Sequence, residues 1–172
     1  MEFFEVIKNR YSYRGKFTSK QLSDDEIKKI LNAAIAAPIG MKIQTTSYVA
    51  ITDKEIISDL GKIIKGNGIS SAPFVLVMLT ENLSGFSSMN FEVENYSAAC
   101  ENILLSVTAL GYATVWTDGI LRAKEVNDAV RSLLKVPKSK TIRAVLPIGE
   151  PKNPTGPKEK DKIEDLVVFN HF

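Results

Sequence analysis

Residues 92–111 read EVENYSAACENILLSVTALG, and this stretch sets the organisation of the chain. Its apolar residues recur every three or four positions, which is the spacing of one face of an α-helix, and Gly111 is the expected C-terminal stop. The apolar stripe consists of Val93, Tyr96, Cys100, Ile103, Leu104, Val107 and Leu110. We therefore predict a helix from Glu92 to Leu110 that lies centrally and packs on more than one side.

Shorter elements flank this helix on both sides. Ser23 and Glu26 form a capping-box pattern at the start of a helix that Pro38 and Gly40 end, and Asp53 is the expected N-cap of another. Further helical and strand patterns give a helix at 124–135 and strands at 47–52, 74–80, 113–117, 141–148 and 165–170. This alternation predicts an α+β or α/β fold in a single domain over residues 1–172.

Length and composition are those of an ordinary globular protein. The chain has 172 residues, of which 44% are hydrophobic and 24% charged, and its net charge is +2. This charge balance gives no case for nucleic-acid binding. No apolar run has the length of a membrane span, and the N-terminus has no signal core, so a cytoplasmic protein is expected. The one cysteine, Cys100, lies in the predicted central helix and is expected to be a buried structural thiol.

The sequence lacks the residue combinations that most kinds of catalysis need, and although catalytic carboxylate pairs stay open, no pair stands out. The one histidine, His171, is the penultimate residue, so neither a zinc cluster nor a Cys-His nucleophile pair can be assembled. There is no G-x-S-x-G, Walker A or G-x-G-x-x-G motif, and Gly66-Asn67-Gly68 is interpreted as a turn because it precedes a strand. Any demanding chemistry is therefore expected to belong to a bound cofactor.

Two cationic stretches lie near opposite ends of the chain. In Arg10-Tyr11-Ser12-Tyr13-Arg14, two guanidiniums and a hydroxyl occupy alternate positions, which point the same way in an extended segment. Guanidiniums bind anionic oxygens bidentately, so this arrangement suits a phosphate, with a solvated basic turn as the alternative. The second stretch is Lys158-Glu159-Lys160.

Four motifs in order give the chain a specific resemblance over nearly its full length. They are Arg10–Arg14, Ala36–Gln44, the long helix with Gly111 and then Trp116–Gly119, and Leu146–Pro151 followed by Lys158–Lys160 and the apolar end. In this order they resemble the nitroreductase family of FMN-dependent oxidoreductases. The resemblance implies an α+β fold in which helices flank a central mixed or antiparallel sheet, with a C-terminal strand reaching across a dimer.

The resemblance also implies an FMN site in which the flavin N5, and no catalytic side chain, carries the chemistry. The implied cofactor-binding residues are Arg10, Ser12, Arg14, Pro38, Ile39, Gly40, Lys42, Gln44, Trp116, Thr117, Asp118, Gly119, Lys158 and Lys160. The first cationic stretch and Lys160 would hold the phosphate. The loop 38–44 would lie against the flavin ring, and the backbone amides of 116–119 would face N5.

The chain departs from the family pattern at four places. Ile39 replaces a serine, Thr45-Thr46 replace Pro-Trp, and Lys160 stands where arginine is common and would act as a point charge. Lys42 replaces an asparagine. A cation near the pyrimidine edge of a flavin would stabilise the reduced ring and raise its potential, whereas a side chain in solvent would not.

The implied activity is electron transfer from NADH or NADPH through FMN to nitroaromatic or quinone-like acceptors by a ping-pong mechanism. The implied assembly is a homodimer with FMN at the subunit interface, without a metal and without nucleic-acid or membrane partners. Two alternatives stay open at this point. One is a non-catalytic flavin-binding carrier or sensor with the same fold, and the other is an anion-binding module without flavin.

Overall fold

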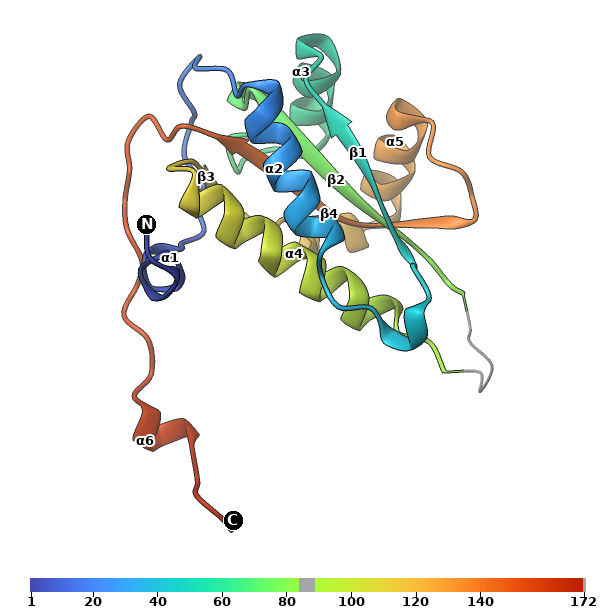
Figure 1. Ribbon diagram of the computed structural model, residues 1–172. Coiled ribbons are helices and arrows are strands. Elements are labelled where there is room, and N and C mark those ends of the chain that lie inside the picture. Colours follow the sequence, from blue (N-terminus) through green and yellow to red (C-terminus); the bar gives the residue numbers. More distant parts are fainter. Residues whose placement is uncertain (84–88, 172) are drawn as a thin grey trace.

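The fold is built on a four-stranded antiparallel sheet. The structure, a computed structural model, describes residues 1–83 and 89–171. The strands are β1 (Thr46–Ile51), β2 (Phe74–Glu81), β3 (Ala113–Thr114) and β4 (Lys140–Gly149). Their spatial order is β1-β2-β4-β3, so β2 and β4 form the middle of the sheet (Figure 1).

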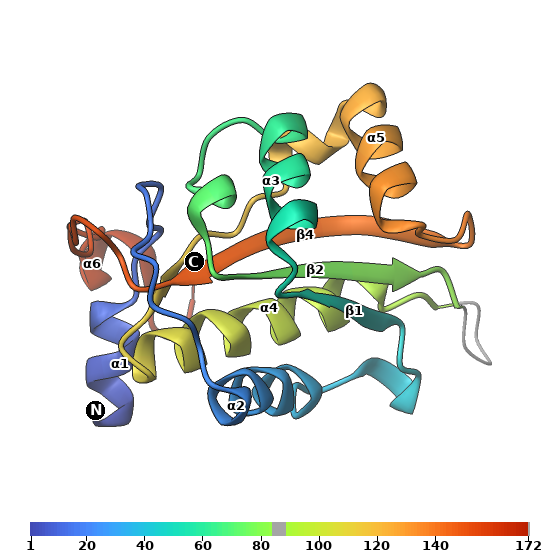
Figure 2. The same cartoon turned by 90° about the horizontal axis from the view of Figure 1, so that it is seen from above.

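Helices cover both faces of this sheet. α2 (Asp24–Ile35) and the long α4 (Glu92–Ala109) lie on one face, whereas α3 (Lys54–Ile63) and α5 (Lys124–Leu134) lie on the other (Figure 2). The remaining helical elements are α1 (Phe3–Asn9), α6 (Ile163–Leu166) and the short 3-10 turns η1 (Gly40–Lys42), η2 (Ile69–Ser71) and η3 (Gly119–Arg122). The mixture of helices with an antiparallel sheet confirms the predicted α+β class.

The predicted helix boundaries follow from local hydrogen bonds. The Ser23 hydroxyl accepts from the backbone N–H of Glu26, and the Glu26 carboxylate accepts from that of Ser23, which completes the capping box of α2. Asp53 caps α3 in a similar way. Gly111 follows α4 with a φ of 80°, a left-handed conformation that glycine adopts without a Cβ penalty. All three predicted signals are confirmed.

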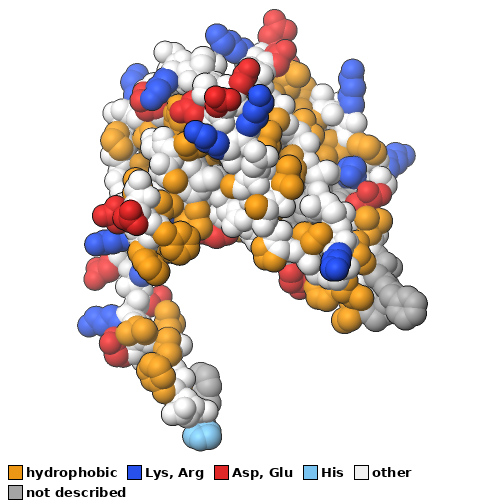
Figure 3. All heavy atoms as spheres, viewed as in Figure 1, with side chains coloured by type: hydrophobic (Ala, Val, Ile, Leu, Met, Phe, Trp, Pro, Cys, Tyr) orange, Lys and Arg blue, Asp and Glu red, His pale blue; other side chains and the backbone are white. Residues whose placement is uncertain are grey.

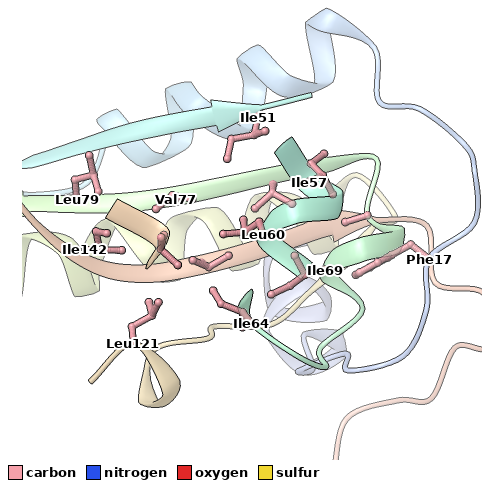
Figure 4. Close-up of a cluster of buried hydrophobic side chains, with 14 of the residues drawn as sticks. Phe17, Ile51, Ile57, Leu60, Ile64, Ile69, Val77, Leu79, Leu121 and Ile142 are labelled. Atoms are coloured by element: carbon pink, nitrogen blue, oxygen red, sulfur yellow. The ribbon is translucent and has the colours of Figure 1, made fainter. Parts of the chain in front are cut away.

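Strand β2 is buried on both faces. Its side chains alternate between two hydrophobic clusters, with Val75, Val77 and Leu79 facing α3 and α5. The intervening residues, Phe74, Leu76 and Met78, pack in the second cluster with α2 and α4. Figure 4 shows Val77 and Leu79 in this first cluster, which also holds Leu60, Ile64 and Ile142. The continuous apolar run at 74–80 is thus the buried strand that the sequence predicts.

The central helix is confirmed, with a difference at its N-terminal end. Cys100, Ile103 and Val107 are completely buried, and burial raises the pKa of the Cys100 thiol, as fits a structural residue. Val93 lies in the first turn and is 52% exposed, although it belongs to the predicted stripe. The strand predicted after α4 is shorter than expected, since β3 holds two residues and Thr117 adds an isolated bridge to Val145.

The strand predicted at 165–170 is wrong for the single chain. The helical turn α6 occupies 163–166, and the backbone N–H of Val167 donates to the carbonyl of Ile163. A strand needs a neighbour for its backbone hydrogen bonds, and this tail runs away from the sheet, so a local helical bond forms instead (Figure 1). Leu166 and Phe169 are exposed, and hydrophobic side chains are visible along the projecting tail (Figure 3).

Residues 1–83 and 89–171 include no helix with the length and apolar character that crossing a membrane requires. Within the same ranges, no three potential metal-ligating side chains of His, Cys, Asp or Glu are grouped closely enough to hold an ion.

A largely buried ion pair joins α4 to the two central strands. Glu92 is 6% exposed and accepts from both Nε (3.0 Å) and Nη2 of Arg143. The hydroxyl of Thr80 on β2 also donates to this carboxylate. Burial alone would raise the pKa of Glu92, but the hydrogen bonds from Thr80 and Arg143 outweigh burial and lower it below its ordinary value of 4.5.

Removing one partner of this pair should destabilise the fold. We expect Glu92→Ala to lower the free energy of unfolding by about 3 kcal/mol, the lower end for a buried pair because Arg143 keeps some contact with water. The double variant Glu92→Met, Arg143→Leu should recover most of this loss, because it leaves no unpaired charge. Urea unfolding followed by circular dichroism measures both effects.

The same pair predicts an acid dependence. Because the folded-state pKa of Glu92 is lowered, its contribution is complete above pH 4.5 and is lost as the pH falls through the folded-state value. The difference in stability between wild type and Glu92→Ala should therefore shrink below pH 4.5. A difference that stays constant down to the acid transition would contradict this assignment.

Candidate functional site

The two cationic stretches face each other across one cleft. The cleft has a volume of about 530 Å³, and its lining residues are Arg10, Tyr11, Ser12, Arg14, Thr155, Gly156, Pro157, Lys158 and Lys160. Side chains from the two ends of the chain therefore come together, including all five that the sequence analysis takes from these stretches.

Backbone pairing positions the N-terminal stretch. After α1 the chain is extended, Ser12 forms a parallel bridge to Thr114, and the backbone N–H of Tyr13 donates to the carbonyl of Thr114 at 2.9 Å. The Tyr13 side chain is 2% exposed and enters the core. Because side chains alternate along an extended segment, Ser12 and Arg14 are left on the outside, where they line the cleft.

The arm that follows β4 is fastened to the same stretch. The backbone N–H of Lys152 donates to the carbonyl of Lys16 at 2.9 Å, and that of Asn153 donates to the Tyr13 hydroxyl at 3.4 Å. These bonds guide the arm along the N-terminal stretch, so that Lys158 reaches the cleft a few residues later.

The cleft is strongly positive. It is lined by the cationic side chains of Arg10, Arg14, Lys158 and Lys160. A carboxylate oxygen of Glu101 on α4 lies 3.8 Å from Nε of Arg10. This one carboxylate orients the Arg10 guanidinium but does not neutralise the four cations of the cleft together. Two guanidiniums, two ammonium groups and the Ser12 hydroxyl form a donor set that fits a phosphate.

The segment 114–119 leads from this cleft along the sheet edge. Thr117 exchanges two backbone hydrogen bonds with Val145, at 3.2 and 2.9 Å, and the Trp116 ring packs edge-on against Tyr96 of α4. The Thr114 hydroxyl and the Trp116 indole N–H are buried and find no hydrogen-bond partner among the residues described. Buried polar groups are normally satisfied, so this segment fits a place where a polar ligand binds.

Asn67 is a residue at this site that the sequence analysis did not identify. Its side-chain amide donates to the Thr117 hydroxyl at 2.9 Å. Gly66, Asn67 and Gly68 all have positive φ, and a Cβ on Gly68 would lie 2.1 Å from the carbonyl oxygen of Gly15. The turn thus packs against the end of the N-terminal stretch and holds segment 116–119. The Gly-Asn-Gly pattern signals the left-handed turn, but nothing in it indicates the contact with Thr117.

The loop 38–44 is held by one buried amide. The Asn95 side chain on α4 accepts from the backbone N–H of Gly40 at 2.8 Å and donates to the carbonyl of Ile43 at 3.0 Å. Between these anchors, Met41 and Lys42 both adopt positive φ values, of 50° and 58°, and Lys42 is exposed. Left-handed backbone at two adjacent non-glycine residues is uncommon and marks this loop as a functional candidate.

The structure does not bring this loop to the cationic cleft within one chain. The cleft lies beside α1, while η1 lies at the other end of α4 (Figures 1 and 2). Pro38, Ile39, Gly40, Lys42 and Gln44 therefore form a separate group of predicted site residues. Gln44 has a local role in its own chain, where its side-chain carbonyl accepts from the backbone N–H of Thr46 at 3.1 Å.

Comparison with known proteins identifies the family. The model of the nitroreductase family matches residues 7–72 and 66–150. The chain belongs to this family. A proposed NADH dehydrogenase/NAD(P)H nitroreductase of Archaeoglobus fulgidus is 31% identical over 170 residues, which cover 98% of this chain and 94% of that protein. The family assignment made from the four motifs is therefore confirmed.

Solved structures agree with the nitroreductase fold. An FMN-dependent nitroreductase from Clostridium difficile superposes with a TM-score of 0.84 at 24% identity, covering 98% of this chain and 99% of that chain. A proposed NADH dehydrogenase/NAD(P)H nitroreductase from Parabacteroides distasonis gives a TM-score of 0.85 at 23% identity, covering 99% and 98%. At these identities the likeness shows the fold of the chain alone.

Proposed function

We propose that this protein acts as a single-domain FMN-dependent oxidoreductase with NADH or NADPH as electron donor. Family membership supports the proposal, and the cationic cleft is the observation that carries it. Its phosphate-type donor set lies at one end of segment 114–119, whose buried Thr114 and Trp116 groups would be next to a bound cofactor. An anion-binding module needs no such second segment, so the flavin proposal accounts for more of the site.

The residues present fit FMN, and each has a physical task. When bound, FMN would supply two-electron chemistry, taking hydride from NAD(P)H and serving nitroaromatic or quinone-like acceptors in a ping-pong cycle. Arg10, Ser12, Arg14 and the two lysines would bind the phosphate. The pairing of Thr117 with Val145 keeps the backbone of 116–119 fixed, so its amides are oriented before binding. Such positioning requires no acid-base pair from the protein.

We further propose a homodimer in which the second subunit supplies the loop 38–44. This loop lies at the far end of α4 from the cleft of its own chain, and Asn95 holds it so that Lys42 is exposed. The apolar side chains of Phe4 on α1 and Phe169 on the tail are also about 80% exposed. A symmetric interface of about 2,000 Å² or more would cover them and join a loop to each cleft.

Phosphate anchoring is the direct test of the proposed function. We expect Arg10→Ala to weaken FMN binding by about 10- to 100-fold, because a charge-assisted hydrogen bond contributes about 1.5–3 kcal/mol. Adding Arg14→Ala should abolish stoichiometric flavin in the purified protein. Equilibrium dialysis of apoprotein with FMN measures the change.

Lys124→Ala is the matched control, since this lysine is an exposed cation of α5 outside the cleft. Full flavin content in the Arg10→Ala, Arg14→Ala double variant would overturn the phosphate assignment. Wild-type protein whose bound flavin is bleached by NAD(P)H and reoxidised by a quinone is an enzyme. Protein that keeps its flavin but does neither is a carrier or sensor.

Lys42 should set the redox potential of the bound flavin. We expect Lys42→Asn to lower the midpoint potential by tens of millivolts, because the ammonium would stabilise negative charge on the reduced ring. Even 1 kcal/mol corresponds to about 20 mV for a two-electron couple. The exposed Lys29 of α2 offers the control Lys29→Asn. Equal potentials in wild type and Lys42→Asn would place the Lys42 ammonium in solvent.

The C-terminal residues after Pro157 should be required for both assembly and cofactor binding. Truncation after Pro157 removes Lys158, Lys160 and the exposed apolar residues that follow. We expect the truncated chain to be monomeric and free of flavin, as measured by sedimentation and absorbance. A folded, truncated monomer that still retains FMN would refute the shared-site dimer.

A further inference from the structure

A second cleft lies beyond segment 116–119, between α4, η3, α5 and the start of β4. Its volume is about 480 Å³, and its lining residues are Val93, Tyr96, Asp118, Leu121, Arg122, Asn127, Thr141, Ile142 and Arg143. None of these residues lines the cationic cleft, and the volume is that of a small-molecule site. Asp118 belongs to the segment proposed to face the flavin, so the two sites adjoin.

The guanidinium of Arg143 is fixed at one wall of this cleft. Its Nε and Nη2 bond to Glu92, which is nearly buried and is not among the lining residues, and Nη1 takes no part in that ion pair. The central carbon of the guanidinium also lies 5.8 Å from the centre of the Tyr96 ring. A charged group that is costly to bury is thereby held rigidly next to an aromatic ring.

A second guanidinium, that of Arg122, lines the same cleft. Nη2 of Arg122 lies 3.2 Å from a carboxylate oxygen of Asp118, one helical turn earlier, and the arginine side chain is 81% exposed. Each guanidinium is paired with one carboxylate, Arg122 with Asp118 and Arg143 with Glu92, and the remaining N–H groups of both arginines can still bind an anion. Val93, Leu121 and Ile142 supply apolar wall.

We propose that this cleft binds a planar aromatic carboxylate. The ring would lie against Tyr96 and the apolar wall, and the carboxylate would accept hydrogen bonds from the N–H groups of Arg122 and Arg143 that their own carboxylate partners leave unused, a planar geometry that suits guanidinium. As a statement about binding, this stands on the cleft alone. The use of such ligands as electron acceptors rests on the proposed function. In that case, nitroaromatic acids are the preferred class of acceptor.

The test compares a charged and a neutral probe on the flavin-loaded protein. Isothermal titration calorimetry gives dissociation constants for 4-nitrobenzoate and for the uncharged 4-nitrobenzyl alcohol. We expect the carboxylate to bind at least tenfold more tightly, and Arg122→Ala to weaken the carboxylate by threefold or more without affecting the alcohol. Lys124→Ala, which also removes an exposed cation paired with a carboxylate one turn away, should change neither value.

A second variant tests the aromatic wall without touching charge. Tyr96→Leu should weaken both probes to a similar degree, because each places its ring on the same surface. Equal affinity of the two probes for wild type would overturn the inference, as would an equal loss in Arg122→Ala and Lys124→Ala. Arg143 is not needed as a variant, since its removal also affects folding.

Turnover separates this inference from the proposed function. If 4-nitrobenzoate binds as expected but neither probe is reduced with NAD(P)H, the inferred carboxylate binding in the cleft is upheld and the oxidoreductase proposal fails. If both probes are reduced with equal KM and bind equally, the oxidoreductase proposal stands and the carboxylate cleft fails.

Discussion

The burial of β2 on both faces is the constraint on which the rest of the structure depends. A strand with apolar side chains on both faces requires a helical layer on each side of the sheet. Here α2 and α4 form one layer, and α3 and α5 form the other. Polar and charged groups are then displaced to the margins of the sheet. Both clefts lie there, one where the N-terminal stretch meets the arm that follows β4 and one beside the start of β4.

Tyr13 converts this general arrangement into a specific site. Its ring is anchored in the core, its backbone pairs with Thr114, and its hydroxyl donates to the carbonyl of Lys16 and accepts from the arm at Asn153. One residue therefore joins three segments that are distant in sequence, its own, that of Thr114 and that of Asn153. The cations flanking it are presented to the outside as a consequence of strand alternation, so the positive cleft follows from hydrophobic burial as much as from charge.

The sequence predicted those parts of the molecule that local physics determines. Helix caps at Ser23 and Asp53, the stop at Gly111 and the buried run of β2 depend on neighbouring residues alone. The order of the motifs indicated that Arg10 and Lys160 would line the same site. Two contacts join segments about 50 residues apart, namely that of Asn67 with Thr117 and that of Glu92 with Arg143. The residues next to these positions in the sequence do not predict either contact. The tail was predicted as a strand because its apolar residues favour one, but a strand also needs a neighbour.

The packing of Trp116 against Tyr96 has a spectroscopic consequence. Trp116 is the single tryptophan of the chain, so its fluorescence carries no background from other indoles. It belongs to the segment that leaves the cationic cleft, and its ring touches the tyrosine that forms a wall of the second cleft. Its emission would therefore respond both to a flavin held by that segment and to a ligand packed on Tyr96. A flavin beside the indole would quench that emission by energy transfer, and a ligand on the far side of Tyr96 would shift it.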